Sequence, residues 1–259
     1  MRKTIIRILD AIGIYNFFLT KKRAYDRRIF EKSEKKNHRY RITFYSAFLS
    51  QGDLVFDVGA NVGNRIQVFL ELGCEVIAIE PQEECIIELK KKFGSAIKII
   101  EKGLGEKEEK KTLFISDANT ISSLSEEWIE SVKTSRFKNH EWNKSVEIEL
   151  TTLDNLITEF GIPKFCKIDV EGFELEVLKG LHQPIPLMSL EYTVPEQTGK
   201  LIECVQYCNQ LNQESKFNYS VEEKMKLELE EFLPYEQFLA LIQEKRFQKT
   251  GFGDIYVKN

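Results

Sequence analysis

Two glycines follow a short apolar run in the first half of the chain. Residues 54–58 are apolar apart from Asp57, and Gly59 and Gly63 come shortly after them. Glycine permits a tight turn from a strand into a helix and lets backbone amides approach a ligand closely. We therefore expect a small-molecule site at this turn, to which Asp57 and Asn61 also contribute.

The spacing of these glycines separates two classes of cofactor. The dinucleotide pattern G-x-G-x-x-G would place glycine at positions 61 and 64, where this chain has Asn61 and Asn64. The loop lacks the glycines that bind a pyrophosphate, which disfavours the alternative of an NAD-dependent dehydrogenase. Glu80 follows the next apolar run, 21 residues after Gly59. It is placed to accept hydrogen bonds from the hydroxyls of a ribose.

Three carboxylates later in the chain could perform acid–base chemistry. Asp169 and Glu191 each end an apolar run, and Glu171 lies in the turn after Asp169. Parallel strands end at one edge of a sheet, so these carboxylates should lie near the glycine loop, where one of them could be a general base. Two or three of them could instead hold Mg²⁺, but no independent metal motif is present and we do not expect a metal. Structural roles, such as binding the amides of a turn or stabilising a helix N-terminus, stay open for all three.

Other polar residues are weaker candidates. His140 and His182 could act as bases, although isolated histidines more often lie at the surface or cap a helix. Asn119, Ser122 and Ser123 form a polar cluster that either touches the substrate or belongs to a solvated loop.

Apolar runs alternate with helix-like segments through most of the chain, which predicts βαβ units and a parallel sheet. The expected strands cover residues 54–58, 75–79, 97–100, 165–169, 187–191, 217–220 and 254–257. Helices are expected over 42–49, 82–93, 197–211 and 235–246, with others after residues 63 and 169.

Residues 105–150 interrupt this alternation. Strands are expected at 111–115 and 146–150, with a long polar segment between them. We interpret this region as an insertion or mobile lid on the substrate side.

Three motifs in this order resemble those of the FkbM family of methyltransferases. They are Asp57-Val58-Gly59-Ala60-Asn61-Val62-Gly63, Ile79-Glu80-Pro81, and Lys167-Ile168-Asp169-Val170-Glu171-Gly172-Phe173-Glu174 with Val177-Leu178-Lys179-Gly180. The resemblance covers residues 42–257. It implies an α/β fold of the Rossmann-like class I methyltransferase type. In that fold a mostly parallel sheet of seven strands, the last one antiparallel, carries helices on both faces.

The same resemblance implies S-adenosyl-L-methionine as the cofactor and O-methylation of a sugar, glycan or other natural product. It assigns Asp57, Gly59, Asn61 and Gly63 to the methionine part of the cofactor, Glu80 to its ribose, and Gly103 with Leu104 to its adenine. A methyltransferase-like module that only mediates interactions is disfavoured, because the glycine loop and the carboxylates are present.

Charge divides the chain into two parts. Residues 1–41 carry a net charge of +9, whereas residues 42–259, the expected methyltransferase domain, carry −13. We interpret the first part as a basic helical appendage. It either packs over the sheet or contacts an anionic membrane surface, and the formation of a homo-oligomer is a further alternative. The acidic domain does not suggest a nucleic acid partner.

The five cysteines form no C-x-x-C pair, which argues against a zinc site and a disulfide framework. No apolar run reaches the length of a spanning helix, so we expect a cytoplasmic protein, with a peripheral location at a membrane as the alternative.

Overall fold

The computed structural model describes residues 36–259, of which residues 44–259 form one compact unit. The predicted amphipathic helix at the start of the chain lies outside the described residues. Residues 36–45 are helical and a turn follows at 46–48, so this helix ends earlier than the predicted range of 42–49. Within residues 36–259, no helix has the length and apolar character that crossing a membrane requires.

The main sheet has eight strands in the order β10-β9-β11-β8-β7-β1-β2-β3. The neighbours from β8 to β3 run parallel, and β11 runs antiparallel to both β8 and β9. The predicted fold class and the antiparallel last strand are confirmed. The count is eight rather than seven because the two-residue strand β10 adds to one edge. The strands are β1 (Leu54–Val58), β2 (Glu75–Ile79), β3 (Lys98–Ile100), β7 (Phe165–Ile168), β8 (Leu187–Thr193), β9 (Lys216–Val221), β10 (Leu233–Pro234) and β11 (Phe252–Lys258).

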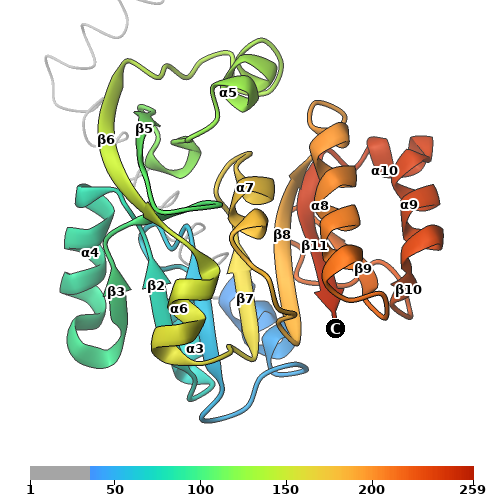
Figure 1. Ribbon diagram of the computed structural model, residues 1–259, viewed down its shortest axis with the longest axis horizontal. Coiled ribbons are helices and arrows are strands. Elements are labelled where there is room, and N and C mark those ends of the chain that lie inside the picture. Colours follow the sequence, from blue (N-terminus) through green and yellow to red (C-terminus); the bar gives the residue numbers. More distant parts are fainter. Residues whose placement is uncertain (1–35) are drawn as a thin grey trace, which may run out of the picture. The chain divides into compact units, whose positions relative to one another are not determined.

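Helices cover both faces of this sheet. They are α3 (Ile66–Glu71), α4 (Glu83–Phe93), α6 (Leu153–Phe160), α7 (Glu174–Lys179), α8 (Thr198–Leu211), α9 (Tyr235–Gln243) and α10 (Lys245–Gln248). Figure 1 shows α7 and α8 in front of the sheet, where Cys166 and Ile168 of β7 join the large apolar core. Phe165 points to the other face, because side chains alternate along a strand, and its ring lies 6.0 Å from that of Phe69 in α3. Two helices differ from the expectation, since α6 was not predicted and the range 235–246 is divided between α9 and α10.

The insertion forms a second, small sheet together with the residues just before it. Strands β4 (Gly103–Leu104), β5 (Lys110–Ile115) and β6 (Lys144–Thr151) lie in the order β4-β6-β5, beside the main sheet in Figure 1. Both strands that were predicted in this region are confirmed. The segment expected to be a polar loop contains helix α5 (Glu126–Lys133), which buries Trp128, Ile129 and Val132. Ser125 caps this helix by accepting a hydrogen bond from the amide of Trp128 at 3.1 Å.

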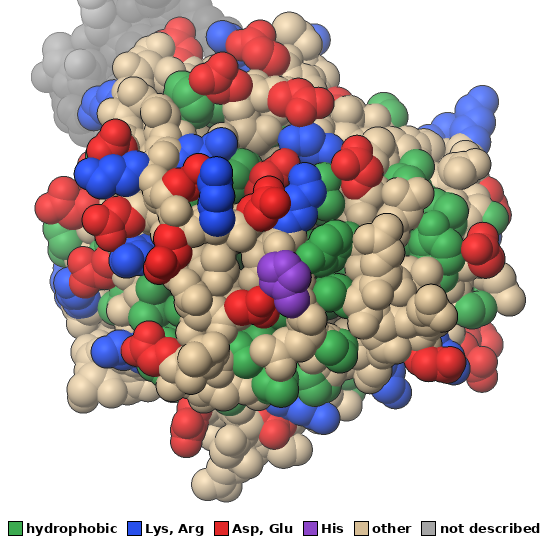
Figure 2. All heavy atoms as spheres, in the orientation of Figure 1, with side chains coloured by type: hydrophobic (Ala, Val, Ile, Leu, Met, Phe, Trp, Pro, Cys, Tyr) green, Lys and Arg blue, Asp and Glu red, His purple; other side chains and the backbone are tan. Residues whose placement is uncertain are grey.

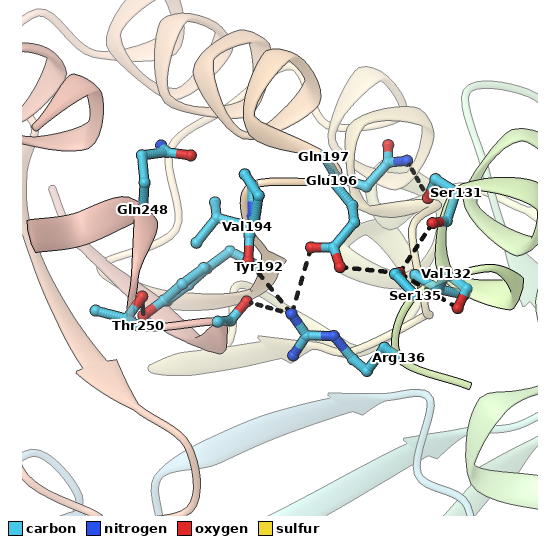
Figure 3. A network of polar contacts seen from close by, with 12 residues as sticks. Ser131, Val132, Ser135, Arg136, Tyr192, Val194, Glu196, Gln197, Gln248 and Thr250 are labelled. Atoms are coloured by element: carbon cyan, nitrogen blue, oxygen red, sulfur yellow. Dashed lines mark hydrogen bonds and ion pairs between the residues drawn. The ribbon is translucent and has the colours of Figure 1, made fainter. Parts of the chain in front are cut away.

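Polar contacts tie α5 to the main sheet (Figure 3). Nη2 of Arg136, just beyond α5, donates to the backbone carbonyls of Val194 at 3.3 Å and Gly251 at 3.0 Å. The same nitrogen lies 3.4 Å from the carboxylate of Glu196, which also accepts a hydrogen bond from Ser135 at 3.0 Å. The insertion is therefore anchored at α5 as well as at its two ends, which limits the motion expected of a lid.

We expect Arg136→Met to lower the free energy of unfolding by about 1–3 kcal/mol, because several backbone and carboxylate acceptors lose a charged donor. Urea unfolding measures this loss, and hydrogen exchange should show faster opening of α5. Arg246→Met is the control, since Arg246 pairs with Glu244 at the surface, where an ion pair contributes little. Equal stability of the two variants would show that the contacts around Arg136 do not anchor the insertion.

Candidate active site

A cavity of about 250 Å³ opens at the carboxyl ends of β1, β2, β7 and β8, and the insertion forms part of its wall. Ligands bind at this edge in open α/β sheets. The insertion contributes Leu113, Thr120, Ser122 and Leu124. The lining includes nine of the ten residues that the sequence predicts for the site: Asp57, Gly59, Asn61, Glu80, Gly103, Leu104, Asp169, Glu171 and Glu191.

Gly63 is the predicted site residue that lies outside this lining. A Cβ atom at this position would approach the ring of Phe93 to 2.4 Å and the side chain of Leu89 to 2.9 Å. Its backbone also has a φ of +80°, which favours glycine. Gly63 therefore permits the close packing of the loop against α4, and its contact with the methionine part of the cofactor stays a prediction.

Gly59 permits a close contact between two strand ends. A Cβ atom there would lie 1.8 Å from the backbone oxygen of Asp169, and φ is +78°. The amides of Gly59 and Ala60 both donate to the carbonyl of Ile79, at 3.0 and 3.1 Å. These amides are thus used within the protein, and Gly59 is required because the end of β7 passes directly against the loop.

Glu80 fixes the loop from the other side. Its two carboxylate oxygens accept hydrogen bonds from the amides of Asn61 at 2.8 Å and Gln82 at 2.9 Å. Burial raises the pKa of Glu80, although these amides act in the opposite direction. Each oxygen keeps a lone pair for a further donor, so the predicted role in binding a ribose stays open.

The three predicted catalytic carboxylates meet in the cavity. Asp169, Glu171 and Glu191 each place an oxygen within 4.8 Å of the others. Glu191 lies inside β8 rather than at its end, as the sequence had suggested. It still reaches Asp169, because Leu190 pairs with Ile168, which brings the next residues of the two strands side by side. Burial and the charge of Asp169 raise the pKa values of Glu171 and Glu191 well above the ordinary range.

Lys167 is a site residue that the sequence analysis did not single out. Its ammonium group lies 2.5 Å from a carboxylate oxygen of Asp169, and the side chain is 5% exposed. Burial favours the neutral acid, but the neighbouring Lys167 holds the pKa of Asp169 below its usual value. Lys167 and Asp169 are two residues apart on an extended segment, so their side chains share one face. The sequence signal that could have identified Lys167 is the presence of a lysine in an otherwise apolar strand.

The carboxylate cluster has the ligand type that a divalent cation prefers. Asp169, Glu171 and Glu191 would supply oxygen ligands to Mg²⁺. Lys167 already provides a positive charge at one oxygen of Asp169. A metal is therefore not needed to keep Asp169 ionised, and the expectation of a metal-independent site is retained for testing.

The insertion holds the turn that carries Glu171. The hydroxyl of Ser123 donates to the backbone oxygen of Glu171 at 2.6 Å. The side chain of Trp128 packs where a Cβ atom of Gly172 would lie, at 2.3 Å. Ser122 lines the cavity, so part of the predicted polar cluster faces the site.

The two histidines lie elsewhere. His182 contacts Asp154 at 2.7 Å with a largely exposed side chain, and His140 contacts Asp117 at 2.9 Å. Neither histidine lines the cavity. Among the described residues that line the cavity, the carboxylates are thus the better candidates for a base.

The family model of the methyltransferase FkbM domain matches residues 57–240 of this sequence. The chain belongs to this family. It is an S-adenosylmethionine-dependent methyltransferase, and the family that the three motifs predict is confirmed. The matched range begins at Asp57 and includes the whole carboxylate cluster. No curated protein matches the sequence significantly.

The solved structures that this chain matches include other methyltransferases. The plantazolicin methyltransferase BpumL, in complex with a triazolic desmethylPZN analog and SAH, is 11% identical with a TM-score of 0.46 and coverage of 99% of this chain and 98% of that chain. The precorrin-6y C5,15-methyltransferase from Geobacter metallireducens is 9% identical with a TM-score of 0.43, covering 85% and 88%. A TehB-like SAM-dependent methyltransferase from Corynebacterium glutamicum is 10% identical with a TM-score of 0.42, covering 85% and 88%.

Glu174 makes the stability of the site depend on pH. The residue is buried, and its carboxylate accepts hydrogen bonds from the amides of Val170 at 3.1 Å and Gly172 at 3.2 Å. Burial raises its pKa to about 7. The folded-state pKa lies above that of the unfolded chain. The stabilising contribution is therefore complete only below the unfolded pKa of about 4.5, and it is lost as the pH rises through 7.

We expect the free energy of unfolding to fall between pH 5 and pH 8, and Glu174→Gln to remove about 1–2 kcal/mol of that fall. Glutamine keeps an oxygen that accepts from the same amides and cannot ionise. Urea unfolding at both pH values measures the difference, with Glu159→Gln as the exposed control. An unchanged pH dependence in the Glu174 variant would contradict a raised pKa.

Proposed function

We propose that this methyltransferase transfers the methyl group to a hydroxyl oxygen of a sugar, a glycan or another small natural product. The observation that carries the proposal is the cluster of Asp169, Glu171 and Glu191 in the same cavity as the cofactor loop. When bound, the cofactor supplies an electrophilic methyl group. A hydroxyl that attacks it must lose its proton, so a base has to stand beside the acceptor.

The three carboxylates suit different parts of this task. Lys167 keeps Asp169 ionised, so Asp169 can accept a hydrogen bond from the acceptor hydroxyl and orient it. The raised pKa values make Glu191 and Glu171 stronger proton acceptors when they are ionised. Glu191 hydrogen bonds to Asp169, so a proton taken from the acceptor can be shared within this pair.

The remaining lining is consistent with the predicted cofactor contacts. Asp57 and Asn61 are assigned to the methionine part and Glu80 to the ribose. Gly103 and Leu104 are assigned to the adenine. Leu113 and Leu124 of the insertion add apolar surface to the same lining, which suits a purine ring.

The charge of the cavity favours a neutral or cationic acceptor over a nucleic acid. Its lining contains six carboxylates and two cationic side chains. Phosphate groups would be repelled by this surplus of negative charge, whereas proteins bind nucleic acid mainly through cationic side chains. A small molecule or glycan therefore remains the proposed acceptor class.

We expect Asp169→Asn and Glu191→Gln each to lower kcat by about 100-fold or more, with little change in the affinity for S-adenosylhomocysteine. The acceptor comes from a screen of sugars and hydroxylated natural products, and release of S-adenosylhomocysteine reports turnover. Glu196→Gln is the control, because Glu196 is a partly buried carboxylate outside the cavity lining.

Treatment with a chelator distinguishes a carboxylate that acts as a base from carboxylates that hold a metal ion. If the carboxylates act as a base, EDTA leaves turnover unchanged, whereas a metal-dependent enzyme loses activity that Mg²⁺ restores. Wild-type turnover in both variants would remove the carboxylates from the chemistry. A product methylated at nitrogen or carbon would contradict transfer to oxygen.

A further inference from the structure

Arg65 is a second cationic side chain of the cavity lining, and the catalytic proposal does not use it. It stands at the end of the cofactor loop, immediately before α3, and its side chain is 9% exposed. Its Nη2 atom donates to the carboxylate of Glu223. Tyr45 and Asp254 act on it electrostatically, and the side-chain hydrogen bond that the described residues provide goes to Glu223.

This guanidinium has more donors than its described partner uses. An arginine side chain carries five N–H groups. Within residues 36–259, Glu223 accepts from one of them, and the buried Nε atom has no partner. The Nε atom itself is enclosed by protein, but the Arg65 side chain lines the cavity. A buried charge with N–H groups to spare is costly, so this guanidinium points to an acceptor that a ligand supplies.

The other charges of the cavity indicate which ligand group this is. Lys167, the other cation of the described lining, is bonded to Asp169 and lies in register with Asp57, whereas Arg65 has one carboxylate partner for its five N–H groups. The cofactor combines a sulfonium, an ammonium and a carboxylate group. The two positive groups suit the six carboxylates of the lining, and the negative group requires a cation.

We propose that Arg65 binds the carboxylate of the cofactor's methionine moiety and so fixes that end of the cofactor in the cavity. Arg65, Asp57 and Asn61 belong to one segment of nine residues, so a single loop would recognise both charges of the amino acid. Arginine can donate two parallel hydrogen bonds to a carboxylate, which selects orientation as well as charge. This inference rests on the cofactor assignment.

The test compares two ligands that differ in one group. S-adenosylhomocysteine carries the carboxylate, and its decarboxylated analogue lacks it. We expect the wild-type protein to bind the first about 10-fold or more tightly in calorimetry, as a charge-assisted contact implies. In Arg65→Met this preference should fall to about 2-fold or less, and Arg65→Lys should give an intermediate value, because the charge stays but the paired donors are lost.

Arg246→Met is the control, since it removes an ion-paired guanidinium outside the cavity lining and should keep the wild-type preference. Thermal unfolding verifies that each variant is folded, and Arg65→Lys supplies the test if Arg65→Met is not. If both Arg65 variants keep the wild-type preference for S-adenosylhomocysteine over its decarboxylated analogue, the proposal is overturned. Arg65 would then only compensate the negative charge of buried acids such as Asp254. Failure of the wild-type protein to bind S-adenosylhomocysteine would instead refute the cofactor assignment itself, and this inference with it.

Discussion

The backbone oxygen of Asp169 occupies the space that a side chain at position 59 would need. This contact, together with the hydrogen bond from the amide of Asp169 to the carbonyl of Val58 at 3.0 Å, joins the end of β7 to the loop after β1. The loop carries the proposed cofactor contacts, and the end of β7 carries Asp169, a carboxylate with a proposed role in catalysis. Their relative position is therefore fixed by the main chain, and a hydroxyl held at Asp169 has a constant relation to the loop.

Buried charge is the second constraint on the site. Asp57 pairs in register with Lys167, which also holds Asp169. Burial raises the pKa of Asp57, while Lys167 and Arg65 oppose that change. Asp57 and Asp169 thus both depend on the charge of Lys167, because an isolated buried charge would be prohibitively costly. The same arrangement compensates the negative charges of Glu171 and Glu191 less completely, which fits the proposed role of these two groups as proton acceptors.

The local pattern of apolar and polar residues was sufficient to predict much of the fold. The apolar runs that form β1, β2, β7 and β8 end in polar residues, and parallel strands bring such ends to one edge of the sheet. The predicted site residues that follow β1, β2 and β7 meet there for this reason. Helix α5 was not predicted, although Trp128, Ile129 and Val132 have helical spacing, because the surrounding segment is polar.

What the sequence did not show depends on contacts between distant residues. The packing of Gly63 against Phe93 and the pairing of Arg65 with Glu223 involve residues 30 and 158 positions apart. The reach of Glu191 to Asp169 depends on the register of two strands rather than on the end of either. No local spacing encodes these relations, whereas the resemblance to the FkbM family did carry the class of chemistry.

A crystal structure of the complex with S-adenosylhomocysteine tests most directly whether this cavity is the site of methyl transfer. We expect the ribose hydroxyls at Glu80 and the sulfur atom facing Asp169 and Glu191, with space for an acceptor hydroxyl between the sulfur and the carboxylates. A ligand bound outside the cavity, or one whose sulfur points away from these carboxylates, would contradict their role in the reaction.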